Sequence, residues 1–134
     1  MAIQYSDGVL NAKLDAIEST IGTAPKMQFF TGSMPATCVT ADSGTKLVDT
    51  ALPSDWMAAA STHAKAKTGT WTLTGIASGS AGYFRIYDSA GSVCHMQGTI
   101  TATGGGGDLT LDNVSVASSQ VITISAFTIT SANS

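Results

Sequence analysis

The chain has 134 residues, enough for one domain with an ordinary core, and its net charge is −3. Hydrophobic residues make up 43% and charged residues only 11%, which excludes an intrinsically disordered chain. Six Lys and Arg without a basic cluster exclude nucleic-acid binding through phosphates. The sequence has no apolar run of membrane-spanning length and no secretory signal at its start. We therefore expect no nucleic-acid or membrane partner, and folding in the cytoplasm.

The first predicted element is an amphipathic helix over residues 7–21. Ser6 is a favourable N-cap residue, and Gly22 suits the left-handed position that ends a helix. Aliphatic residues spaced three or four apart form one narrow stripe on this helix: Leu10, Leu14, Ile17 and Ile21. A helix of this length is marginal in water, so the stripe must dock on something. Its own β domain, a twin helix in an oligomer and another protein all remain open as partners.

After Pro25 the pattern becomes that of short strands separated by Gly- and Ser-rich turns. Strands are expected over residues 27–31, 46–52, 70–74, 83–87, 93–100, 109–111 and 121–130. A change of phase along the last of these predicts a β-bulge near Ala126. The only short helix expected among the strands covers residues 52–60, and residues 61–65 are interpreted as an exposed loop.

A hairpin is the best-marked part of the β region. Its two strands, residues 83–87 and 93–100, flank the turn sequence Asp88-Ser89-Ala90-Gly91. Strand alternation places two of its side chains on one face and three on the other: Phe84 and Ile86, and then Tyr83, Arg85 and Tyr87.

Seven or eight short strands predict an all-β fold, a jelly-roll-like β-sandwich with an N-terminal amphipathic helix. The chain then divides into an N-terminal helical arm, residues 1–24, and a β-sandwich domain, residues 25–134.

Residues suited to chemistry are few. His63 and His95 are the only histidines, and a predicted strand places His95 on the face opposite to Cys94. No serine lies in a G-x-S-x-G motif. Asp112-Asn113, which with Asp108 offers oxygen ligands, is typical of a turn between strands rather than of a calcium loop. We expect no enzyme, no catalytic residue, no cofactor and no metal.

Two further groups of residues leave alternatives open. Cys38 and Cys94 either form a disulfide or remain free thiols, and the missing secretory signal favours free thiols. Five aromatic residues either form a sugar-stacking platform or belong to the core and to oligomer contacts, the second being favoured: Trp56, Trp71, Tyr83, Phe84 and Tyr87.

Segments spread over almost the whole length resemble a family of small virion structural proteins of tailed bacteriophages and prophages. The resemblance rests on residues 1–6, 11–18, 52–57, 83–91, 94–99 and 104–113. It implies a capsid decoration, or cement, protein that binds the major capsid protein lattice on the virion exterior and stabilises the head after assembly in the bacterial cytoplasm. It carries no catalytic residue.

A cement role assigns the stripe of Leu10, Leu14, Ile17 and Ile21 to an oligomer or capsid contact. A lattice-bridging protein is expected to be a homo-oligomer, either a dimer or a trimer. Two alternatives stand beside it: a tail or fibre component, and a β-sandwich module that binds host glycans.

Overall fold

The computed structural model describes residues 3–132, so the outermost residues of the predicted arm and β domain lie outside it. Within this range one helix, α1 (Asp7–Ile21), precedes ten strands. The strands are β1 (Lys26–Thr31), β2 (Lys46–Ala51), β3 (Ala64–Ala66), β4 (Trp71–Thr74), β5 (Gly79–Tyr87), β6 (Cys94–Ala102), β7 (Leu109–Leu111), β8 (Ser115–Val116), β9 (Val121–Ile124) and β10 (Thr128–Thr130). The prediction of a mostly β chain with one N-terminal helix is confirmed.

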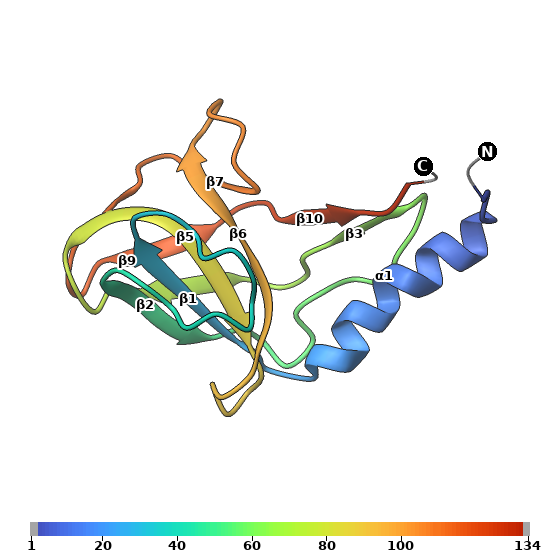
Figure 1. Cartoon of the computed structure of the whole chain (residues 1–134), viewed down its shortest axis with the longest axis horizontal. Helices are drawn as coiled ribbons and strands as arrows, with labels where there is room; N and C mark the ends of the chain where they lie inside the picture. The colour runs from blue at the N-terminus through green and yellow to red at the C-terminus, as the bar shows by residue number, and fades with distance from the viewer. Residues whose placement is uncertain (1–2, 133–134) are drawn as a thin grey trace.

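The largest sheet has six strands in the order β2-β1-β5-β6-β7, with β8 paired to the start of β5. It is mixed, because β6 and β7 run parallel whereas its other pairs are antiparallel. The ribbons β4–β9 and β3–β10 complete the fold, and the main sheet does not close into a barrel. Figure 1 shows α1 projecting beside the β3–β10 ribbon, away from the main sheet.

The helix begins and ends where the sequence predicts. The Ser6 hydroxyl accepts a hydrogen bond from the Val9 N–H at 3.3 Å. Gly22 has a φ of 93° and donates its N–H to the Glu18 carbonyl at 2.9 Å. Both caps satisfy backbone groups that the helix leaves without partners. α1, the one helix within residues 3–132, lacks the length and the apolar character needed to cross a bilayer.

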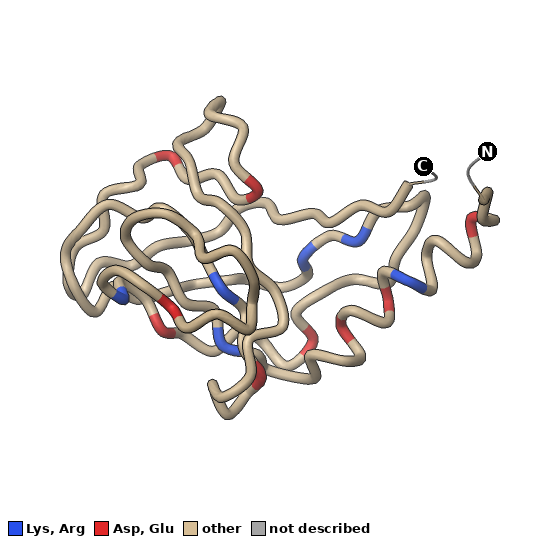
Figure 2. Tube along the Cα trace, in the orientation of Figure 1, with Lys and Arg blue, Asp and Glu red and all other residues tan. Residues whose placement is uncertain are grey.

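A buried lysine fastens α1 to the ribbon beside it. Lys65 of β3 is 1% exposed, and its ammonium lies 2.8 Å from the Asp15 carboxylate and 2.7 Å from that of Glu18. One turn nearer the helix start, the Asn11 side chain accepts a hydrogen bond from the His63 N–H at 3.1 Å. Figure 2 shows the acidic residues along α1 and the basic residues on the neighbouring strand. Opposite charges therefore hold the helix against residues of the predicted β domain.

The predicted hairpin is confirmed as β5 and β6, with Tyr83 opposite Thr99 and Tyr87 opposite Cys94. In its turn the Asp88 carboxylate accepts a hydrogen bond from the Ser92 N–H at 2.8 Å. Both faces of β5 are covered, since the side chains at its centre are buried alike on either side: Tyr83, Phe84, Arg85 and Ile86.

Aromatic rings fill the centre of the core. The Trp71 ring lies 6.1 Å from that of Trp56 and 5.4 Å from that of Phe127, which meets Phe84 edge to face at 5.7 Å. The Trp56 indole N–H donates to the Gly22 carbonyl at 3.0 Å. The end of α1 is therefore joined directly to this aromatic core.

The prediction of one bulged strand over residues 121–130 is wrong. β9 pairs with β4, whereas β10 pairs with β3 in a different ribbon. Between them Phe127 is buried in the core, and its carbonyl accepts a hydrogen bond from the Lys67 N–H at 2.9 Å. The change of phase marks the passage of the chain from one ribbon to the next.

The short helix predicted over residues 52–60 is also wrong. The Trp56 carbonyl accepts a hydrogen bond from the Thr68 N–H, and the Ala58 N–H donates to the Ala66 carbonyl. This pairing with residues around β3 outweighs local helix propensity. Residues 61–65, predicted as an exposed loop, lead into β3, where Lys65 is buried.

Candidate functional site

Residues 32–45, which we name the β1–β2 loop, connect the first two strands without helix or strand. A connection of this length without secondary structure is uncommon in a compact domain and is typical of functional loops. In Figure 1 it folds back over the main sheet, where hydrogen bonds attach it to β5 and β6.

Arg85 of β5 holds the middle of the loop from below. Its side chain is 1% exposed, and one guanidinium nitrogen donates to the carbonyls of Thr37 and Thr40 at 3.2 and 2.8 Å. The other two nitrogens donate to the Gln97 amide oxygen at 3.1 Å and to the Tyr87 hydroxyl at 3.3 Å. Within residues 3–132 no carboxylate forms an ion pair with this guanidinium. Neutral oxygens of the loop therefore solvate a buried positive charge.

The pKa of Arg85 stays above its ordinary value. Burial acts to lower it, but the hydrogen bond to Tyr87 and the electrostatic influence of Cys94 and the neighbouring tyrosines outweigh that effect. The guanidinium is consequently charged at neutral pH, where it holds the loop.

The ends of the loop are fixed as well. The Tyr83 hydroxyl donates to the Ser43 carbonyl at 2.7 Å and accepts from the Ser43 N–H at 2.9 Å. Thr31 and Thr45 are joined by two hydrogen bonds, of 3.0 and 2.8 Å. Between these anchors Gly44 has a φ of 77°, and a Cβ there would collide with the Thr31 carbonyl oxygen. Hydrogen bonds therefore hold the loop at both ends as well as at its middle.

The outer surface of the loop is nearly uncharged and carries exposed apolar side chains. Val39 is 96% exposed and Met34 is 37% exposed, while Asp42 is the loop's one charged residue. A loop that hydrogen bonds hold in place loses little conformational entropy on binding. This surface suits docking on another protein by shape and apolar contact.

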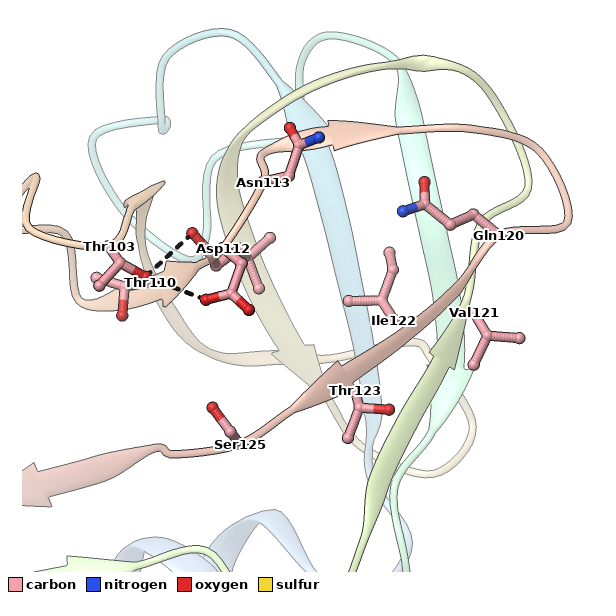
Figure 3. A pocket seen from close by; sticks show the side chains of 10 residues that line it. Thr103, Thr110, Asp112, Asn113, Gln120, Val121, Ile122, Thr123 and Ser125 are labelled. Atoms are coloured by element: carbon pink, nitrogen blue, oxygen red, sulfur yellow. Dashed lines mark hydrogen bonds between the residues drawn. The ribbon is translucent and has the colours of Figure 1, made fainter.

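A second candidate site is a polar groove of about 430 Å³ between the β6–β8 segment and β9 (Figure 3). Asp112 lines one side of it, and the Asp112 carboxylate lies 3.5 Å from the Thr103 hydroxyl. The amide oxygens of Asn113 and Gln120 accept hydrogen bonds from the N–H groups of Ser115 and Ala117. No hydrogen bond within the described residues uses their NH₂ groups, so amide donors and a carboxylate acceptor line the same groove.

The helix stripe lies largely inside the protein. Leu10, Leu14 and Ile21 are 0, 2 and 5% exposed, and Ile21 belongs to the main core. These three side chains are covered by the chain's own residues, which was one of the alternatives that the sequence left open. Ile17 is half-buried and lines a shallow groove of about 280 Å³ together with His95 of β6.

The aromatic residues considered for sugar stacking lie in the core. Trp56, Trp71, Tyr83 and Phe84 are at most 1% exposed, and Tyr87 is half-buried. The prediction of core positions for these residues is confirmed for the first four.

The polar candidates from the sequence go to separate places. His63 meets Asp7 at 2.6 Å, at the start of α1. Asp108 accepts hydrogen bonds from Thr99, whereas Asp112 lies in the groove. Cys94 and His95 lie on opposite faces of β6 as predicted, with Cys94 toward the β1–β2 loop. Within residues 3–132 no three metal-ligating side chains of His, Cys, Asp or Glu gather together.

The sequence carried one unused signal for the β1–β2 loop. Between the predicted strands 27–31 and 46–52 lie 14 residues, 32–45, for which no helix, strand or Gly-rich turn is expected. No other gap between predicted strands is as long without a predicted element. Comparison with known proteins adds nothing to these two sites, because no family model, no curated protein and no solved structure matches the chain.

Proposed function

We propose that this chain is a non-enzymatic bacteriophage capsid decoration protein that binds the major capsid protein lattice on the outside of the virion. The β1–β2 loop is the observation that carries the proposal: it is ordered by buried hydrogen bonds, almost uncharged, and presents Val39 fully to solvent. The sequence resemblance to small virion structural proteins supports the same role.

The mechanism follows from the weakness of a shell at its seams. Internal DNA pressure separates neighbouring capsomers, and a small protein bound across a seam opposes that separation. Many copies that each contribute a few kcal/mol stabilise the shell through multivalency. A protein that bridges a seam must contact the capsid at more than one place. The proposal therefore includes a homo-oligomer, either a dimer or a trimer.

The finer architecture is part of the proposal too. A jelly-roll-like sandwich is supported by a core that lies between strands of the main sheet and the β4–β9 ribbon, where Phe84 and Leu73 are both buried. Of the helix stripe, only Ile17 is retained in the proposal as an oligomer or capsid contact, because this residue keeps accessible surface in the groove beside His95.

The test compares two aspartate variants on empty capsids assembled from the major capsid protein of the same phage. Val39→Asp places a charge at the loop tip, and Val93→Asp places the same charge at a 50% exposed position in the β5–β6 turn. We expect Val39→Asp to lower occupancy at least about tenfold, since burying an unpaired charge at an interface costs more than 1.4 kcal/mol, and Val93→Asp to bind normally. Equal binding of both variants contradicts the assigned surface.

Electron cryomicroscopy of the intact virion tests the role itself. Hundreds of copies along capsid seams support decoration. A handful of copies confined to the tail identifies a tail or fibre component and contradicts the proposal.

The polar groove favours a second function, a module that binds host glycans. Its carboxylate, hydroxyls and amide NH₂ groups match the alternating donors and acceptors of a neutral sugar, and it contains no cationic side chain. A glycan array checks this: binding that Asp112→Ala abolishes and Asp108→Ala retains supports it, and an empty array removes it.

A further inference from the structure

The two cysteines meet where the β1–β2 loop crosses β6. Cys94 is the first residue of β6, and its side chain interacts with that of Cys38 in the loop. Both are free thiols and both are partly buried. The Cys94 thiol also donates to the Met96 carbonyl at 3.5 Å. Two side chains far apart in the sequence therefore lie near each other.

Hydrogen bonds from Arg85 hold the segments that carry the two cysteines. Arg85 binds the carbonyls of Thr37 and Thr40, on either side of Cys38. The same guanidinium donates to the hydroxyl of Tyr87, the residue that pairs with Cys94 across the hairpin. One buried side chain therefore binds the loop backbone on both sides of Cys38 and the side chain of the residue that pairs with Cys94.

We propose that Cys38 and Cys94 are a covalent modification site, which closes to an intramolecular disulfide when the protein meets a low-molecular-weight disulfide such as oxidised glutathione. The two thiols lose two protons and two electrons, and the glutathione disulfide takes them up as two glutathione thiols. The bond adds a covalent link between the β1–β2 loop and the main sheet to the hydrogen bonds that hold the loop there in the reduced protein.

The order of attack follows from the environment of the Cys94 sulfur. Burial, and then the contact with Cys38, raise the pKa of Cys94 to about 12. Cys38 therefore attacks the glutathione disulfide first and releases one glutathione. Cys94 next loses its proton and attacks the Cys38 sulfur, which expels the second glutathione. Because the thiolate is the nucleophile, this closing step accelerates about tenfold per pH unit around neutrality.

The experiment treats the native full-length chain with oxidised glutathione at about pH 8.5, where thiolate attack is faster, and quenches it in acid. We expect an intact mass lower by two hydrogens, monomer mobility on a non-reducing gel, a linked peptide containing Cys38 and Cys94, and a Tm above that of the reduced chain. Cys94→Ser should stop at a mixed disulfide on Cys38, and Cys38→Ser should remain unmodified.

Three results overturn the proposal. These are two free thiols in the native chain under conditions that oxidise the urea-unfolded chain, covalent dimers in place of the monomer, and a wild-type mixed disulfide that persists as the pH is raised. All three are read from the wild-type protein, so they do not depend on the folding of either variant.

Discussion

Replacing Arg85 by Met tests whether one buried side chain orders the β1–β2 loop. Methionine replaces the aliphatic part of the arginine side chain but has no donor, so the variant loses four hydrogen bonds. Bonds to a charged group contribute about 1.5 kcal/mol each at the low end, or about 6 kcal/mol together. Burial of the guanidinium without a carboxylate partner costs several kcal/mol, which the variant recovers. The balance is a loss of about 2 to 4 kcal/mol in the free energy of unfolding.

Urea unfolding followed by tryptophan fluorescence measures this loss, since both indole rings are buried. Hydrogen exchange then locates it. We expect the N–H groups of Thr40 and Ser43 to exchange much faster in Arg85→Met, whereas that of Phe29 in β1 keeps its protection. Arg85→Lys keeps the charge but not the planar fork of donors. Its free energy of unfolding should therefore lie between those of the wild type and Arg85→Met. Unchanged exchange in the loop, or a loss below about 1 kcal/mol, would refute the assignment.

Gly44→Ala should lose about 2 kcal/mol or more, because a Cβ there meets a backbone carbonyl, whereas Gly104→Ala, also at positive φ but with open space, should lose about 1 kcal/mol by urea titration. Leu14→Ala should lower the free energy of unfolding by about 2 to 5 kcal/mol, which a fall in Tm reports. A Tm close to that of the wild type would show that the helix is not part of the core. The hydrogen bond from Lys65 lowers the pKa of Asp15, so the stability that this carboxylate contributes is present above its unfolded pKa, near 4, and is lost as the pH falls through its folded pKa. Lys65→Met should therefore flatten the fall of the urea midpoint with acid, and parallel curves would contradict the ion pair.

Local signals account for what the sequence predicted well. The helix is specified by its caps and its stripe, and the hairpin by the turn after Tyr87, all within a few residues. The division of the last strand was missed because residues 121–130 carry a pattern of two phases, which is the same for a bulge and for a change of sheet.

The candidate site depended on distant residues. Arg85 was placed on one face of a strand correctly, but nothing near it in the sequence shows that Thr37 and Thr40 return to cover it. Lys65 is similar, because a lysine in a short polar segment is usually exposed. Asp15 and Glu18 lie three residues apart and so share one face of the helix, where both pair with Lys65, but this spacing alone does not identify their partner.

One residue holds both ends of the described chain. The His63 ring lies 2.6 Å from Asp7 at the start of α1, and the His63 carbonyl accepts a hydrogen bond from the Ser131 N–H at 3.0 Å. Figure 1 shows the two ends side by side. A short peptide linker could therefore join them, and a circular permutant opened in the exposed turn at Gly104 should keep the fold. The start of α1 and the end of β10 are therefore held at the same place on the fold by one histidine.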